Sequence, residues 1–171
     1  MRQVAANAGM SLSNLQYYFR TKNELLKGVV DFYFQKCENE FEANLDASGN
    51  DDVRQRVYKL IKPHLVYGDD LAEICKIFRE LWGFATRNED INDHLVSYYR
   101  RYAKRLSEEF EYLSFMPDVI PQVISLLIPY FEGYSITSTS VSLNAGQVAD
   151  MLSDITMSIL EGTIGEGSSS V

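Results

Sequence analysis

The side chains best suited to recognition chemistry lie in the first 24 residues of the chain. Gly9 can adopt the positive φ that ends a helix, and Ser11 is a favourable N-cap for a helix that follows it. Hydroxyl, amide and phenol groups, which hydrogen-bond base edges and phosphates, would line the exposed face of that second helix: Ser13, Asn14, Gln16 and Tyr17. Helix, glycine turn and helix in this order predict a DNA-binding helix-turn-helix.

Two amides in this segment are candidates for reading bases. Gln16 can bind an adenine through two hydrogen bonds, and Asn14 can do the same or bind a phosphate. Apolar side chains at the remaining positions are expected to form the packed interior of the two helices: Val4, Ala5, Ala8, Met10, Leu15 and Phe19.

Charge is distributed unevenly along the chain. The whole sequence carries 24 acidic and 16 basic residues, a net charge of -8, which by itself argues against binding to phosphate. Residues 1–36, however, hold five basic and two acidic residues and so carry +3, which leaves -11 for the remainder. This asymmetry is typical of a nucleic-acid-facing end, although chance variation on a solvated surface explains it equally well.

Helical periodicity of apolar residues continues through nearly the whole sequence, and no strand-length segment alternates with period two. The pattern predicts an all-α fold: a helix-turn-helix head followed by a helical ligand-binding and dimerisation bundle. The expected helices after the motif cover residues 22–45, 51–65, 71–86, 89–115, 119–134 and 148–160. Three parts follow: the head with its connecting helix over residues 1–45, the bundle domain over 51–164 and a flexible tail over 165–171.

The two expected C-terminal helices are unusually apolar. Residues 119–134 are apolar on nearly every face, and a helix of that kind must be buried on all sides. A partner chain would provide that burial through a four-helix interface, with an entirely internal helix as the alternative. The candidate interface residues are Val123, Ile124, Leu127, Tyr130, Phe131, Met151, Leu152, Ile155 and Ile159.

Aromatic side chains with polar tips are the candidates for binding a small molecule in the bundle. Their ring faces and hydroxyls suit a semi-polar or cationic ligand, although aromatic residues at helical spacing more often form core. The candidates are His64, Tyr67, Phe78, Trp82, Tyr98, Tyr102, Tyr130 and Tyr134.

Other functional classes find little support in the residues. His64 and His94 are the two histidines, and the chain has no HExxH, GxSxG or glycine-rich phosphate loop, so we expect no enzyme, cofactor or metal. Cys37 and Cys75 have neither disulfide-scaffold nor zinc-site spacing. The longest uncharged apolar stretch, residues 119–131, is shorter than the ~20 residues of a membrane span, and the N-terminus lacks a secretory signal. A cytoplasmic protein is therefore expected.

The N-terminal motif resembles that of the TetR (tetracycline-repressor) family. The run AxxAGMSLSNLQYYFRTKNELL shares with it the alanine-glycine turn, the serine, the aromatic-Tyr-Phe end of the recognition helix, and the following lysine and Glu-Leu. The matching residues are Ala8, Gly9, Ser11, Leu15, Tyr17, Tyr18, Phe19, Lys22, Glu24 and Leu25. Residues 78–82 and the helix beginning at Asn88 are similar, more weakly, to the choline/betaine-regulator branch of that family.

This resemblance implies specific roles for the motif residues. Ser11, Ser13, Asn14 and Gln16 would face the major groove, while Tyr17 and Lys22 would bind phosphate, which completes the candidate DNA-binding set. Position 16 is often tyrosine in the family, so the glutamine here favours base reading over a phosphate contact.

The resemblance also implies partners and a mechanism. The partners would be a palindromic, double-stranded operator, a second copy of the chain and a small-molecule effector that releases the DNA. Because the expected helix 22–45 belongs to both the head and the bundle, an effector that changes the bundle would change the spacing of the two recognition helices.

One departure from the family concerns the N-terminus. Family members begin with a further helix, whereas this sequence starts inside the first motif helix, so truncation, a misassigned start or omitted residues are expected. The alternative function is a helical dimeric module that binds a ligand or protein but, in this truncated form, no DNA.

Overall fold

The computed structural model describes residues 1–45, 51–66, 69–113 and 116–163, and within these ranges the side chains of residues 37–45 and 69–75 lie outside the description. Every regular element in the described part is helical, so the predicted all-α fold is confirmed. The eight α-helices of these ranges are α1 (Arg2–Asn7), α2 (Leu12–Tyr18), α3 (Lys22–Leu45), α4 (Val53–Ile61), α5 (Asp69–Ala85), α6 (Glu89–Glu111), α7 (Ile120–Thr137) and α8 (Ala145–Leu160).

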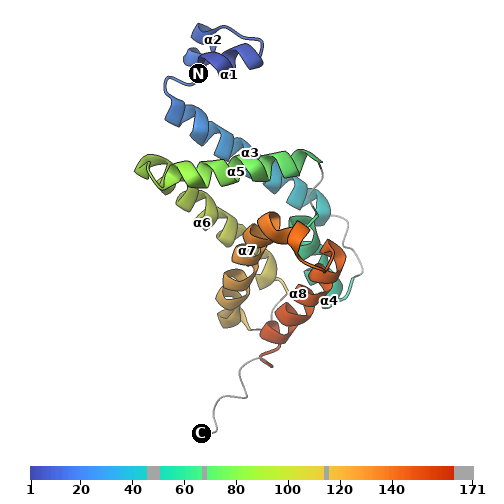
Figure 1. The fold of residues 1–171 in the computed structure, drawn as a ribbon. Coiled ribbons are helices and arrows are strands. Elements are labelled where there is room, and N and C mark those ends of the chain that lie inside the picture. Colours follow the sequence, from blue (N-terminus) through green and yellow to red (C-terminus); the bar gives the residue numbers. More distant parts are fainter. Residues whose placement is uncertain (46–50, 67–68, 114–115, 164–171) are drawn as a thin grey trace.

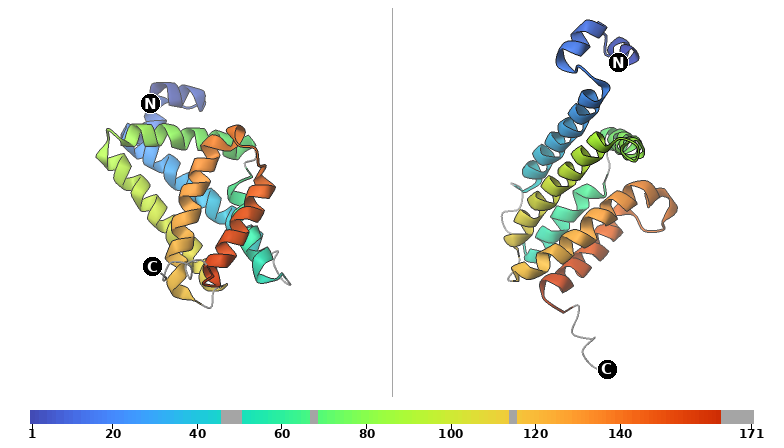
Figure 2. Two further views of the ribbon diagram at one scale, coloured as in Figure 1. Left: turned by 60° about the horizontal axis from the view of Figure 1, so that its bottom comes forward. Right: turned by 90° about the vertical axis from the view of Figure 1, so that its left-hand side faces the viewer.

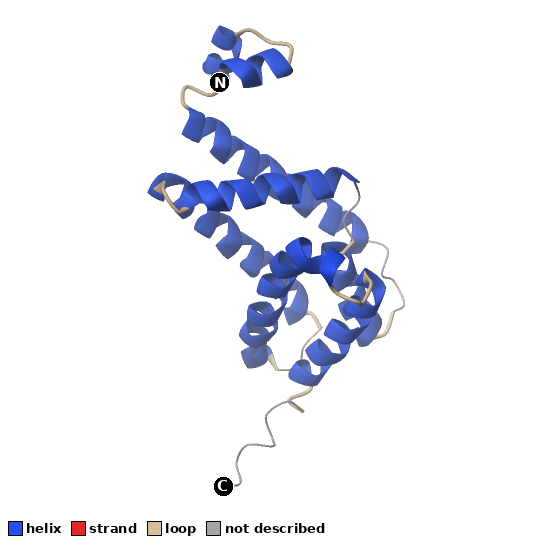
Figure 3. Cartoon of the chain, in the orientation of Figure 1, coloured by secondary structure: helices blue, strands red, loops and turns tan. Residues whose placement is uncertain are grey.

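The helices form a small N-terminal unit and a larger bundle (Figure 1). The short α1 and α2 lie together beyond the N-terminal end of α3, and α3 runs from them into the bundle (Figures 1 and 2). Within the bundle α6 packs against α3, α5 and α7, and α4 packs against α8. Short 3-10 turns and loops join the helices, as Figure 3 shows for the described segments. We call α1 and α2 the α1–α2 unit, and α4 to α8 the body.

Side-chain caps at the helix starts explain several of these boundaries. Asp52 accepts a hydrogen bond from the Gln55 backbone N–H, and Asn144 forms a reciprocal capping box with Gln147. The predicted helix 51–65 is shorter in the structure because Pro63, which lacks an N–H, lies in a 3-10 turn at Lys62–His64. Local polar residues therefore determine where these helices start and stop.

Two hydrophobic clusters form the core, and α6 contributes to both. The first joins α4, the C-terminal half of α6, α7 and α8 around residues such as Val57, Phe110 and Leu127. The second joins α3, α5 and the N-terminal half of α6 around Val30 and Leu95. Because α6 crosses from one cluster to the other, it connects the end of the body near α3 to the C-terminal helices.

One face of the apolar helix α7 is buried by its own chain. Val123, Ile124, Leu127 and Phe131 face the first core cluster, together with Leu152 of α8. Of the candidate interface residues, these five are covered without a partner, because α4, α6 and α8 surround the inner side of α7. Internal packing therefore accounts for the inner face of α7, while the burial of its remaining apolar side chains by a second copy of the chain stays a prediction.

By length and composition alone, Pro117–Ser140 is apolar enough to count as a candidate membrane span. The sequence argument missed this segment because it ended the apolar stretch at the charged residue Glu132. The inner side chains of this segment pack against other helices of the body, as those of a core helix do.

Candidate nucleic-acid interface and effector region

The turn between α1 and α2 has the geometry that the motif predicts. Gly9 adopts a φ of 66°, the left-handed conformation that glycine reaches without steric cost. The backbone N–H groups of Gly9 and Met10 donate to the carbonyls of Ala6 and Ala5, at 3.1 and 3.0 Å. The Ser11 hydroxyl then accepts a hydrogen bond from the Asn14 N–H at 3.1 Å and so caps α2. The two helices are thereby held in a tight helix-turn-helix.

The interior of this unit is smaller than the sequence predicted. Ala5 and Leu15 are buried, and Met10 and Phe19 are half-buried. Val4 is 43% exposed and Ala8 is also exposed, so their assignment to the interior is wrong. Two short helices share a single contact face, and side chains beyond that face remain in solvent.

The candidate DNA-binding residues all lie on the surface. Ser11, Ser13, Asn14, Gln16, Tyr17 and Lys22 are exposed, and Tyr17 retains 81% of its accessible surface. The Ser11 hydroxyl also lies 3.1 Å from that of Ser13, so Ser11 is already engaged as the helix cap. The amides of Asn14 and Gln16 are the groups on α2 best suited to reading base edges.

Lys22 is exposed but has a neighbour in the body. Its ammonium nitrogen lies 4.8 Å above the centre of the Phe84 ring, which belongs to the end of α5. The residue predicted to bind phosphate therefore lies at the start of α3, against the end of α5.

A close approach between Phe19 and Gly28 positions α2 on α3. A Cβ atom at Gly28 would lie only 2.7 Å from Cε1 of the Phe19 ring, so a glycine lets the ring lie directly against the helix. The link between α2 and α3 is further tied by Thr21, whose hydroxyl accepts from the Glu24 N–H at 3.1 Å. The Glu24 carboxylate accepts from the Arg20 N–H at 2.8 Å. The sequence reasoning missed Gly28, although a lone glycine inside a helical pattern is a signal of close packing.

Two of the candidate effector residues belong to the second core cluster. Phe78 and Tyr98 are buried, with ring centres 5.3 Å apart, and the Tyr33 ring lies 4.5 Å from that of Phe78. These rings pack tightly against each other, so they are part of the core of the α3–α5–α6 interface.

His64 and Tyr102 form a polar contact beside the first core cluster. The Tyr102 hydroxyl lies 3.0 Å from His64 Nδ1, and the His64 ring stacks on that of Phe131 at 4.7 Å. Burial lowers the pKa of His64 to about 4, because an apolar surrounding disfavours the charged imidazolium. The histidine is therefore neutral at physiological pH. The Tyr98 and Tyr102 rings, 6.2 Å apart, join this group to the second cluster.

Trp82 belongs to a polar chain that the sequence reasoning did not find. Its Nε1–H donates to the Tyr99 hydroxyl at 3.3 Å, and that hydroxyl is hydrogen-bonded to the Glu132 carboxylate. Burial disfavours the charged form of the Glu132 carboxyl group and so raises its pKa. Glu132 could have been identified as the charge that interrupts an apolar run. These hydrogen bonds between Trp82, Tyr99 and Glu132 link α5, α6 and α7, and they place a carboxyl group beside the aromatic candidates.

The remaining candidates are spread over different environments. The Tyr130 and Tyr134 rings stack 6.2 Å apart on α7, and Tyr134 is buried in the first cluster, whereas Tyr67 lies outside the described residues. The structure thus brings most of the predicted aromatic residues into contact as two adjoining groups, one on each side of the middle of α6.

The candidate interface residues that stay accessible lie on α7 and α8. Tyr130, Ile155 and Ile159 are half-buried, and Met151 is 36% exposed. Within the described part of the chain, no group of three or more His, Cys, Asp or Glu side chains is placed to bind a metal ion.

Comparison with known proteins gives one informative relative. The chain is 37% identical over 157 residues to an uncharacterised HTH-type transcriptional regulator encoded in the dhlA 5′ region of Xanthobacter autotrophicus. The alignment covers 92% of this chain and 78% of that protein. No protein-family model matches the chain, and no solved structure is significantly similar to it.

Proposed function

The chain belongs to the HTH-type transcriptional regulators, and we propose that it is a TetR-type repressor that a small molecule releases from its operator. The observation that carries this proposal is the exposed polar face of α2, with Ser13, Asn14 and Gln16 presented beyond the end of the body. The positive charge of residues 1–36 supports contact with phosphates, and the protein would act in the cytoplasm.

The proposed division of the chain follows the helices. Residues 1–45 would bind DNA and connect to the body, and residues 51–164 would bind the effector and a second copy of the chain. A homodimer would present two copies of α2 about one helical turn of DNA apart, which requires a palindromic, double-stranded operator. Tyr130, Met151, Ile155 and Ile159 are the predicted interface residues that their own chain leaves accessible for that contact.

Gel-shift titration with the DNA upstream of the gene tests the DNA-binding function. We expect binding that weakens with salt, because neutralised phosphates release counterions. Gln16→Ala should relax the sequence preference, and Lys22→Ala should weaken binding to all sequences alike. Gln55→Ala and Lys104→Ala are matched controls, since both residues are exposed in the body. No binding at low salt would instead favour the helical ligand- or protein-binding module.

The proposed effector is a semi-polar or cationic molecule held by the aromatic residues of the body. The carboxylate of Glu132, hydrogen-bonded to Tyr99 beside Trp82, supports a positively charged group in the ligand. Operator titrations with and without each compound that binds the body test this mechanism. Equal operator affinity in the presence of every such compound would refute release by an effector.

A further inference from the structure

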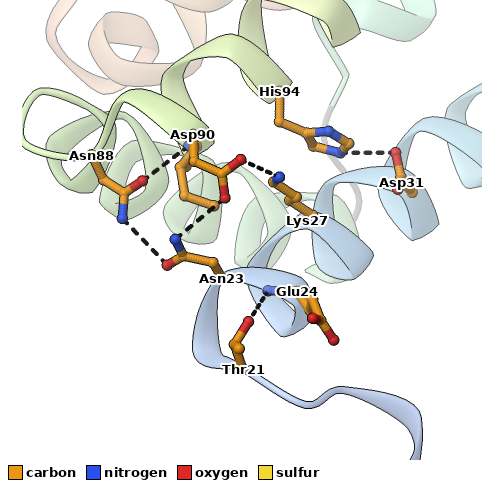
Figure 4. A network of polar contacts seen from close by, with 9 residues as sticks. Thr21, Asn23, Glu24, Lys27, Asp31, Asn88, Asp90 and His94 are labelled. Atoms are coloured by element: carbon orange, nitrogen blue, oxygen red, sulfur yellow. Dashed lines mark hydrogen bonds and ion pairs between the residues drawn. The ribbon is translucent and has the colours of Figure 1, made fainter.

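A cluster of polar side chains fastens the start of α3 to the corner between α5 and α6 (Figure 4). Asn23 donates its side-chain N–H to Asp90 and accepts from the Asn88 side chain, each at 3.3 Å. Lys27, one turn further along α3, forms an ion pair with the same Asp90 carboxylate. We call these four residues the corner clasp. The contacts between them join residues 63 to 67 positions apart in the sequence, so the clasp depends on the tertiary fold.

The clasp lies directly beside the attachment of the α1–α2 unit. Lys27 is adjacent in sequence to Gly28, against which the Phe19 ring packs. Lys22 precedes Asn23 and lies over the Phe84 ring at the end of α5. The body therefore contacts the same two turns of α3 that carry α2.

Asp90 is the centre of the clasp. The Lys27 ammonium, with a smaller contribution from the Asn23 N–H, keeps the pKa of the Asp90 carboxyl below its ordinary value. Asn88 adds rigidity, because its side-chain oxygen also caps α6 by accepting from the Ile91 N–H at 3.1 Å. A second tie lies further along α3, where Asp31 is 3.0 Å from His94 Nε2 and 3.3 Å from the Arg101 guanidinium.

Stability alone does not account for an arrangement of this kind. Lys27 and Asp90 are 31% and 54% exposed, and ion pairs that solvent reaches contribute little to stability. Directional bonds from two successive turns of α3 to one carboxylate do, however, restrict how that helix can rotate against α6. A rotation there would be passed directly to α2.

We propose that Asp90 is a positioning residue for DNA binding: by holding Asn23 and Lys27, it sets the orientation of α2 relative to the body. This inference rests on the proposed contact between α2 and the operator. It makes the α5–α6 corner the place where a change in the body reaches the DNA-binding end.

Operator affinity of Asp90→Ala tests the proposal against a matched control. Glu89→Ala removes an equally placed negative charge, because Glu89 is exposed in the same first turn of α6. Loss of a negative charge alone should strengthen binding to DNA, so Glu89→Ala should bind equally well or slightly better. We expect Asp90→Ala to bind roughly 2- to 30-fold more weakly, the usual range for a residue that modulates coupling between sites. The two variants should have the same melting temperature within a few degrees.

Amide hydrogen exchange without DNA separates this proposal from the proposed function. Asp90→Ala should accelerate exchange in the first two turns of α3 relative to Glu89→Ala, while exchange in α8 stays unchanged. Equal operator affinity of the two variants, or equal exchange in α3, would overturn the role of Asp90. If the wild-type protein binds no DNA while the two variants still differ in exchange, the proposed function is refuted, and Asp90 holds the start of α3 without a role in DNA binding.

Discussion

The α1–α2 unit and the body differ in how much of their surface is buried. Of the residues in α1 and α2, Ala5 and Leu15 are buried, and both Tyr17 and Tyr18 are largely exposed. The body surrounds α6 with two clusters that include fully buried side chains such as Phe110. Since buried apolar area is the main stabilising contribution, the body holds most of the stability, and the unit exposes most of its side chains to solvent.

This difference makes α3 the critical connection. The unit has too little interior to set its own orientation, so it depends on the Phe19 contact with Gly28 and on the capped start of α3. Substitutions in the body should therefore change the free energy of unfolding, whereas substitutions near the unit should change DNA affinity with smaller effects on stability. The four predictions below test that separation.

The largest effect is expected in the first core cluster. Phe110→Ala removes a fully buried ring and should lower the free energy of unfolding by roughly 3 to 5 kcal/mol, because it leaves a cavity. Urea denaturation measures this loss. Tyr112→Ala, at a side chain that is 85% exposed, is the control and should change stability by less than about 0.5 kcal/mol. Similar losses in both variants would mean that burial in the first core cluster does not determine what these rings contribute to stability.

The buried imidazole of His64 predicts a dependence of stability on pH. Its pKa is about 4 in the folded protein and 6.5 ordinarily, so the unfolded state takes up the proton first as the pH falls. The free energy of unfolding should therefore decrease as the pH falls from 6.5 toward 4, by up to about 3 kcal/mol. Denaturation at several pH values should show this slope in the wild type and a flatter one in His64→Phe. The same slope in both proteins would contradict the assignment to His64.

A smaller effect is expected at the cap of α2. Ser11→Ala removes the hydroxyl that accepts the Asn14 N–H and should destabilise α2 by about 1 kcal/mol. Because the unit contributes little to global stability, amide exchange in α2 should detect this change more clearly than the melting temperature does. Ser13→Ala is the comparison, since Ser13 lies inside the helix and does not cap it. Faster exchange in Ser13→Ala than in Ser11→Ala would contradict the capping role.

The smallest effect on stability is expected at two helical glycines. They also test most sharply whether effects on DNA affinity and effects on stability arise in different parts of the molecule. Gly133→Ala, with no atom near the added Cβ, should raise stability by roughly 0.5 to 1 kcal/mol through better helix propensity. Gly28→Ala should gain less, because the new Cβ displaces the Phe19 ring. Operator affinity should fall in Gly28→Ala and stay unchanged in Gly133→Ala. Equal affinities would show that the Phe19 contact does not orient α2.

Features that depend on a few neighbouring residues were predictable from the sequence. Gly9 and Ser11 act locally, one through its backbone freedom and the other through a hydrogen bond three residues away. The all-α fold follows from apolar periodicity for the same reason, since each helix contains its own hydrogen bonds. Periodicity also identified α7 as apolar, but it could not tell burial by the same chain from burial by a partner.

Contacts between distant segments were not predictable in this way. Glu132 and Tyr99 meet across different helices, and Phe19 meets Gly28 after the chain has turned between α2 and α3. The roles proposed for Gln16 and Lys22 in DNA recognition and for the aromatic residues in effector binding stay predictions, since they concern molecules that the chain alone does not contain.

The sequence by itself determined that this chain is helical, that its N-terminal end carries a helix-turn-helix and that residues 1–36 have a net positive charge, because these properties depend on local hydrogen bonding, backbone conformation and composition. Only the tertiary structure decided which charges are already paired and which helix faces are already covered. Asp90 meets Asn23 and Lys27 because α3 and α6 pack together, and the inner face of α7 is covered because it shares one core cluster with α4, α6 and α8. Packing of distant elements depends on the whole set of helix faces at once, which no single segment encodes.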